Sequence, residues 1–161
     1  MLYWKVLFVK PRTEKKVTEY CAIYSIPYYL PLREKSHRVQ RRLVTVDIPV
    51  FPGYVFVKLD PLRRLDILKT NLVSKVLEPE NTRKMLKDLV MVRRALQINP
   101  SLQTTAPLAE GRKVRIVSGA FMGVEGRVAR LAKQTKVILN IELIGQAIAV
   151  EVDRLEIETM D

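Results

Sequence analysis

The sequence has few of the residues from which catalytic and metal centres are built. It contains one cysteine, Cys21, and one histidine, His37, so an intramolecular disulfide is excluded and a Cys/His metal cluster lacks ligands. Paired carboxylates in an apolar setting, a Ser/His/Asp set and a phosphate-binding glycine loop are also missing. We therefore predict a protein that is not an enzyme and that uses no cofactor and no metal ion.

Long apolar runs are missing as well. No stretch approaches the roughly 18 apolar residues of a membrane-spanning helix, and the N-terminus does not have the layout of a signal peptide. The single cysteine fits a reducing compartment, and it falls on the apolar side of a predicted helix, where we expect it to be buried. These features predict a soluble, cytoplasmic monomer that does not interact with membranes.

Several residue types are confined to one part of the chain. All nine prolines lie at or before Pro107, five of the six glycines lie at or after Gly111, and ten of the eleven aromatic residues lie within residues 1–56. Residues 1–97 hold 20 Lys and Arg against 9 Asp and Glu, whereas residues 98–161 hold 8 of each kind. A domain boundary near residue 100 explains this uneven distribution. Because the excess positive charge lies in the first part, we expect a nucleic-acid or acidic partner to bind there.

The first part predicts an α+β fold, in which helices pack on an antiparallel sheet. Thr13 is placed to cap a helix that starts at Glu14, and Asp60-Pro61 is a strong helix start. In the helix after Pro61, the leucine spacing predicts that Leu62, Leu65 and Leu68 face inward. The expected strands are residues 3–9, 28–32 (an edge strand because of Pro31), 54–57 and 72–77, and a last helix starts near residue 82.

The stretch Phe51 to Lys58 predicts a turn that runs directly into a strand. Pro52 and Gly53 favour the turn, and aromatic and β-branched residues follow. Alternation places Val55 and Val57 in the core. Phe51 and Tyr54 flank the turn, so we expect them at the surface, as an aromatic anchor for a partner.

The most basic stretch, residues 33–42, predicts a hairpin with a basic tip. It holds Arg33, Lys35, Arg38, Arg41 and Arg42 against one acidic residue. Two interpretations stay open: a solvated charged loop, or an arm that contacts phosphates, which the net charge of the surrounding domain favours.

Residues 98–107 are uncharged and contain two prolines, which is typical of a flexible, partly extended linker. The residues after it contain short strands separated by glycine turns, at 114–117, 126–129, 136–141 and 147–152. So many short strands in so short a chain predict a small β-barrel.

Residues 111–128, Gly-Arg-Lys-Val-Arg-Ile-Val-Ser-Gly-Ala-Phe-Met-Gly-Val-Glu-Gly-Arg-Val, resemble a KOW motif, with Ala120 where that motif often has proline. Together with a first strand containing Trp4, the following Lys-Pro-Arg-Thr-Glu (residues 10–14) and Phe-Pro-Gly-Tyr-Val-Phe-Val (residues 51–57), the whole chain resembles the NusG family of transcription elongation factors. The resemblance implies a NusG N-terminal domain over residues 1–97, a linker over 98–107 and a KOW domain over 108–161.

The resemblance also implies a function by binding alone. The N-terminal domain of this family docks on the clamp helices of RNA polymerase, and a factor that prefers the closed clamp suppresses pausing and termination, which is antitermination. The implied RNA polymerase-binding residues are Trp4, Phe8, Phe51 and Tyr54, although Trp4 and Phe8 fit a core position equally well. The implied contacts to upstream or non-template DNA are Lys10, Arg12, Arg38, Arg41 and Arg42.

The KOW domain of the family recruits a partner, a ribosomal small-subunit protein or the termination factor Rho. The implied residues are Phe121, Leu143 and Ile144, and for the last two a place in the barrel core is an equal alternative. Two further alternatives stay open. The strongly basic first part and residues 56–61, Phe-Val-Lys-Leu-Asp-Pro, resemble specialised RfaH-like antiterminators more closely than housekeeping factors. A KOW-containing RNA-binding or ribosome-associated protein is the competing function, although the neutral KOW part argues against a ribosomal protein.

Overall fold

The computed structural model of the chain describes residues 2–108, 110–131 and 134–160. The backbone groups into two compact units. We call them the first unit, Met1–Pro31 with Phe51–Thr82, and the second unit, Leu32–Val50 with Arg83–Asp161. This grouping differs from the expected limits, because residues 32–50 and the helix after Thr82 group with the C-terminal part. The domain limits therefore stay a prediction.

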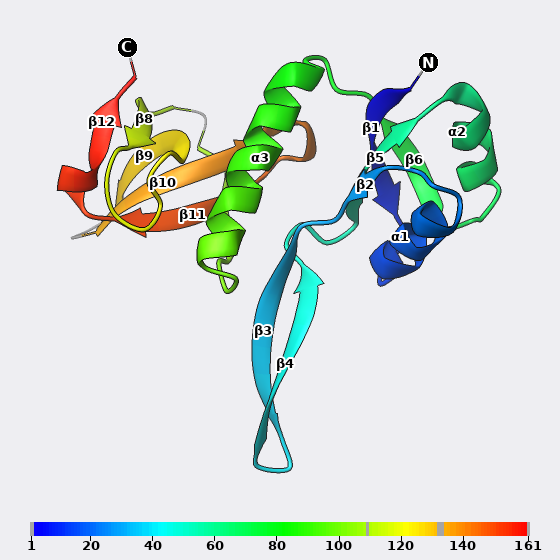
Figure 1. The fold of residues 1–161 in the computed structure, drawn as a ribbon, viewed down its shortest axis with the longest axis horizontal. Coiled ribbons are helices and arrows are strands. Elements are labelled where there is room, and N and C mark those ends of the chain that lie inside the picture. The colour runs from blue at the N-terminus through cyan, green and yellow to red at the C-terminus, as the bar shows by residue number, and fades with distance from the viewer. Residues whose placement is uncertain (1, 109, 132–133, 161) are drawn as a thin grey trace. The chain divides into compact units, whose positions relative to one another are not determined.

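The first unit contains a four-stranded antiparallel sheet with two helices, in agreement with the predicted α+β fold (Figure 1). The strand order is β2 (Tyr28–Tyr29), β5 (Tyr54–Leu59), β1 (Tyr3–Val9) and β6 (Val73–Leu77), and the helices are α1 (Glu14–Ile23) and α2 (Pro61–Leu68). Strand β2 lies at an edge, as the proline at position 31 predicts.

One face of this sheet forms a hydrophobic core with both helices. Val55 and Val57 are fully buried there, which confirms their predicted position, together with Cys21 of α1 and Ile67 of α2. Burial raises the pKa of the Cys21 thiol to about 11, so this cysteine is a packing residue and not a reactive thiol at neutral pH.

The two helix starts differ in how they are capped. The side chain of Asp60 accepts a hydrogen bond of 2.7 Å from the backbone N–H of Arg63, which confirms the predicted cap. Helix α1 also starts where expected, but the Thr13 hydroxyl donates to the carbonyl of Lys10 and caps no helical N–H. That part of the prediction was wrong because the Thr13 backbone, with φ of −109° and ψ of 2°, lies outside the extended region in which an N-cap oxygen reaches the helical N–H groups.

The predicted inward face of α2 was wrong for Leu62 and Leu65 and is confirmed for Leu68, which packs against the core. Leu62 and Leu65 are 69% and 58% exposed, whereas Ile67 is buried and Leu68 is half-buried. Arg64 of the same helix pairs at 3.0 Å with Glu78, which directly follows β6, and Ile67 and Leu68 pack on the core. The first two leucines of α2 therefore face solvent.

The second unit combines a ribbon, a helix and a six-stranded antiparallel sheet (Figure 1). The ribbon pairs β3 (Leu32–Val39) with β4 (Arg42–Pro49), and the helix is α3 (Thr82–Ile98). The sheet has the order β12 (Ile157–Thr159), β8 (Lys113–Ile116), β9 (Glu125–Leu131), β10 (Gln134–Ile141), β11 (Gln146–Val152) and β7 (Thr104–Thr105). The four strands predicted in this part are confirmed, and closure of the sheet into a KOW barrel stays a prediction.

Part of the expected linker belongs to this sheet. Thr104 and Thr105 pair with Ile148 and Ala147 of β11, and Leu102 is buried. An extended uncharged segment is well suited to add a short strand to an exposed sheet edge, since it brings no charge to be desolvated.

Helix α3 is joined to the six-stranded sheet by polar contacts. The ammonium groups of Lys84 and Lys87 lie 2.6 Å and 3.0 Å from carboxylate oxygens of Glu142 and Glu125, respectively. An Arg94 N–H donates to the carbonyl of Gly123. Basic residues on α3 thus contact the second sheet and its loops.

None of the helices in the described part of the chain is long and apolar enough to cross a membrane.

Candidate partner-binding surfaces

Three of the residues implied in polymerase binding lie on one face of the first sheet, opposite to its helices. The register pairs Phe8 of β1 with Tyr54 of β5, and residues paired in this way share a face. Two positions further along, Val6 pairs with Phe56, and next Trp4 pairs with Lys58. We call Trp4, Phe8 and Tyr54, with the buried Val6 and Phe56 between them, the aromatic face.

The side chains of the aromatic face differ in their exposure to solvent. Trp4, Phe8 and Tyr54 are half-buried, whereas Val6 and Phe56 are fully buried. The Phe8 and Tyr54 rings lie 5.3 Å apart between centroids, and the ammonium of Lys75 lies 5.7 Å from the Phe8 centroid. An aromatic surface with cations at its border suits a partner that presents apolar residues beside carboxylates.

The expected exposure of Phe51 was wrong. Phe51 is 1% exposed and belongs to the largest fully buried side chains. The turn itself is present, closed by the Tyr54 N–H donating to the Phe51 carbonyl at 3.2 Å. A turn fixes where the backbone runs but not where its flanking side chains point, and burying a phenyl ring removes a large apolar area from water. Phe51 therefore supports the turn from inside.

Gly53 is required at this turn for two reasons. Its φ is +92°, a conformation that side chains of L-residues rarely adopt. A Cβ at this position would also lie 3.2 Å from the Phe8 ring. The glycine thus permits the close approach of the turn to the aromatic face.

The predicted basic hairpin is confirmed as the ribbon of β3 and β4. Arg38, Arg41 and Arg42 are all exposed, and the two-residue turn is made by Gln40 and Arg41 with φ of 49° and 68°. These are the dihedrals of a tight hairpin turn that normally selects Asn or Gly. Lys10 and Arg12 are exposed too, but they lie in the first unit, in the loop after β1.

Arg33 and Lys35 belong to the stretch predicted as a phosphate-contacting arm, but they are not among the residues implied by the family resemblance. The register places both on one face of the ribbon together with Arg42, whereas Arg38 lies on the other face. Once the two-residue turn is placed at residues 40–41, the alternation of side chains along each strand identifies this face. The sequence does not mark the position of the turn, because the turn contains no glycine.

The residues implied in partner binding by the second sheet do not come together in one pocket. Ile144 is buried and Leu143 is half-buried in the short turn between β10 and β11, which ends at Gly145. Of the two alternatives left open by the sequence, the structure supports the core position for Ile144, whereas Leu143 stays partly exposed. Phe121 is half-buried in the loop before β9.

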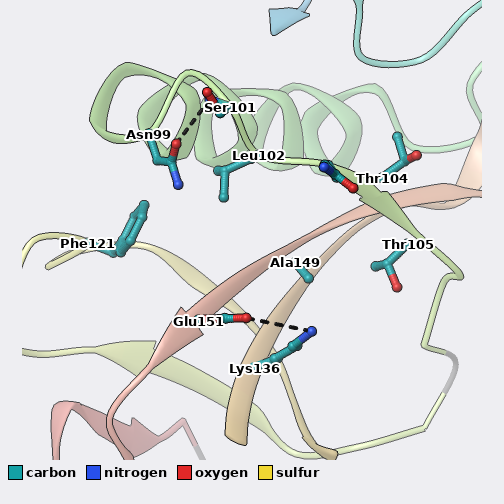
Figure 2. Close-up of a pocket in the computed structure, with 10 residues that line it drawn as sticks. Asn99, Ser101, Leu102, Thr104, Thr105, Phe121, Lys136, Ala149 and Glu151 are labelled. Carbon is teal, nitrogen blue, oxygen red and sulfur yellow. Dashed lines mark hydrogen bonds and ion pairs between the residues drawn. The ribbon is translucent and has the colours of Figure 1, made fainter. Parts of the chain in front are cut away.

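Phe121 lines a pocket of about 440 Å³ in the second unit (Figure 2). The ion pair of Lys136 with Glu151, at 3.9 Å, lies on the sheet side of the pocket, and Asn99 and Ser101 lie on the side of the segment after α3. The other lining residues are Leu102, Gln103, Thr104, Thr105 and Ala149. Within the described ranges, no group of His, Cys, Asp or Glu residues is arranged to hold a metal ion.

Asp88 of α3 is a carboxyl group whose pKa is raised by the fold. Burial raises its pKa from 3.8 to about 6, against the opposing effect of Lys84, while the Glu142 carboxylate raises it further. Lys113 and Lys87 also act on it and lower the pKa. The groups that act on Asp88 come from α3 itself, from Lys113 of β8 and from Glu142 after β10, so we assign it to the contact between α3 and the sheet.

The fold and these surfaces define a protein with two potential binding surfaces, an aromatic sheet face and a basic β-ribbon. The sequence model of the family described as "Transcription termination factor nusG" matches residues 2–135, which is most of the chain. A comparison with the curated proteins finds no match. The chain belongs to the NusG family, and it is thus a transcription elongation or termination factor. Members of this family bind RNA polymerase, as the sequence resemblance implied.

Proposed function

We propose that this protein binds RNA polymerase through the aromatic face, at the clamp helices, and that it acts without catalysis. The observation that carries the proposal is the common face of Trp4, Phe8 and Tyr54, held by a sheet whose other face is packed under two helices. Half-buried aromatic rings on a rigid support are the usual anchors of a protein interface, because little side-chain entropy is lost on binding.

Binding to the closed clamp produces the regulatory effect. If the factor binds the closed state of the polymerase more tightly than the open state, it shifts the population toward the closed state by its difference in affinity. A closed clamp holds the nucleic acids in place, so pausing and termination become less frequent, and the factor is an antiterminator.

Basic residues complete the proposed interaction by contacting upstream duplex or the displaced non-template strand. Arg41 and Arg42 at the tip of the ribbon, and Lys10 and Arg12 in the loop after β1, are exposed and carry the charge for it. The six-stranded sheet is proposed as a KOW domain that recruits a ribosomal small-subunit protein or Rho, with Phe121 and Leu143 at its surface.

The test is the affinity of the purified full chain for core RNA polymerase without nucleic acid, compared with a Phe8→Ala, Tyr54→Ala double variant. If both rings are binding hot spots, each truncation costs about 2 kcal/mol, roughly thirtyfold in affinity. Tyr24→Ala is the matched control, because Tyr24 also forms an aromatic pair, with Tyr20 at 4.5 Å, but at the C-terminal end of α1. Equal affinity of the double variant and the wild type would refute docking through the aromatic face.

A further inference from the structure

The register of the ribbon sorts its side chains into two faces of different chemistry. On one face, each cross-strand pair joins a basic residue or His37 to a β-branched aliphatic residue. The pairs are Arg33 with Ile48, Lys35 with Val46, His37 with Val44, and Arg42 with Val39. We call this the cationic face; it carries three permanent positive charges and no acidic residue.

The other face of the ribbon carries both of its acidic residues. Its pairs are Leu32 with Pro49, Glu34 with Asp47, Ser36 with Thr45, and Arg38 with Leu43. The hydroxyl oxygens of Ser36 and Thr45 lie 3.0 Å apart, as expected for side chains on one face. We call this the opposite face. Its two carboxylates outnumber its one arginine, so the positive charge of the stretch is gathered on the cationic face.

The charges of the cationic face have no internal role. Arg33, Lys35 and Arg42 form no ion pair with any described residue, whereas Arg63 and Arg115 each hold a carboxylate. Among the aliphatic partners, Val39 is 46% and Val46 is 38% exposed. A surface of unpaired cations beside exposed methyl groups matches a ligand that presents regular negative charge next to apolar edges.

We infer that the cationic face binds the sugar–phosphate backbone of a nucleic acid, with Arg33, Lys35 and Arg42 on phosphates and the aliphatic side chains against sugars or bases. The opposite face, including Arg38, points away from the nucleic acid. The inference deepens the proposed function and rests on its nucleic-acid contact, but it does not depend on docking of the aromatic face.

The geometry of the ribbon fits this ligand. Residues two apart on a strand repeat every ~6.8 Å, and phosphates repeat every ~3.4 Å of axis along one strand of a duplex, so Arg33 and Lys35 meet separate phosphates. The major groove of a duplex admits a two-stranded ribbon. A single-stranded nucleic acid presents the same phosphate groups as a duplex. The experiment below therefore compares binding to a duplex with binding to single strands.

The experiment measures binding of the full chain to a labelled DNA duplex, to one of its single strands, and to an RNA strand of the same sequence. Fluorescence anisotropy is recorded over a range of salt concentrations. The variants are Arg33→Ala, Lys35→Ala and, as the matched control, Arg38→Ala, which removes the same charge from the same strand on the opposite face.

For at least one of the three nucleic acids, Arg33→Ala and Lys35→Ala are each expected to weaken binding roughly tenfold near 0.1 M salt. The slope of log affinity against log salt falls by about 0.9 per residue for duplex or 0.7 for a single strand. Arg38→Ala leaves the slope unchanged, and Lys35→Arg restores it. The nucleic acid with the largest loss identifies the ligand.

Three results would overturn the inference: no binding of the wild type to any of the three, an equal loss in Arg38→Ala, or an unchanged slope in Arg33→Ala and Lys35→Ala. Circular dichroism verifies that each variant is folded. The affinity of the same variants for polymerase, measured without nucleic acid, separates this inference from the proposed docking. If the chain does not bind polymerase, the nucleic-acid result still stands, and if it does not bind nucleic acid, the docking proposal still stands.

Discussion

The aromatic face and the basic ribbon differ in how many buried residues and strands hold their side chains in position. The aromatic face belongs to a four-stranded sheet whose other face is a packed core, and on the aromatic face itself the fully buried Val6 and Phe56 lie between the half-buried rings. The ribbon has two strands, and most of its side chains are exposed. A surface that depends on packing is specified by buried residues, whereas a surface that depends on register is specified by its turn and its alternation. Mutations of the buried residues at the first surface should therefore lower stability, whereas mutations at the second surface should change binding alone.

The largest expected contrast comes from one apolar truncation at each surface. Phe56→Ala removes a fully buried ring and should lower the free energy of unfolding by about 3–5 kcal/mol. Leu43→Ala, at a side chain 70% exposed on the ribbon, should change it by less than about 0.5 kcal/mol. Urea unfolding followed by circular dichroism measures both, and similar losses would show that the ribbon is packed more closely than the comparison assumes.

A smaller effect is expected at the turn that borders the aromatic face. Gly53→Ala combines an unfavourable φ with a Cβ 3.2 Å from the Phe8 ring, and we expect a loss of about 2 kcal/mol in unfolding free energy. Gly145→Ala is the control, because Gly145 has φ of +61° but no atom within 4 Å of an added Cβ. It should cost about 1 kcal/mol. An equal cost for the two would remove the role assigned to the contact with Phe8.

The smallest effect concerns the second unit and depends on pH. Because the pKa of Asp88 is raised to about 6 by burial, the folded chain binds this proton more tightly than the unfolded chain. The free energy of unfolding therefore gains a contribution as the pH falls from about 6 to about 4, and this contribution is lost above pH 6. After allowance for the partial exposure of the carboxyl, we expect about 1 kcal/mol.

Asp88→Asn should remove this dependence and raise stability at pH 7. Thermal unfolding of both proteins at pH 4.5 and pH 7 measures the effect. A variant with the same pH dependence as the wild type between these two values would contradict the assignment to Asp88.

Sequence reasoning succeeded where the determining interactions are local. Asp60 followed by proline identified a helix start, and alternation placed Val55 and Val57 in the core, because each depends on a few neighbouring residues. It failed for Phe51 and for the leucines of α2. Whether a turn residue points inward, and which side of a short helix is covered, is decided by segments far away in the chain.

The candidate surfaces follow the same division. The stretch 51–57 and the basic hairpin were recognised from composition, and the family from its motifs. The sequence alone does not show that Val6 and Phe56 lie on the aromatic face, because this depends on how β1 pairs with β5. The two-sided chemistry of the ribbon required the register, because a turn of Gln40 and Arg41 carries none of the usual hairpin residues.

The most direct test of this account compares the two surfaces in one set of measurements. The Phe8→Ala, Tyr54→Ala variant and an Arg33→Ala, Lys35→Ala variant are each assayed against RNA polymerase without nucleic acid and against nucleic acid without polymerase. The account predicts that the first variant loses polymerase affinity and keeps nucleic-acid affinity, and that the second does the reverse. If either variant lost both affinities while remaining folded, the two surfaces would not be separate binding sites, and the account would be contradicted.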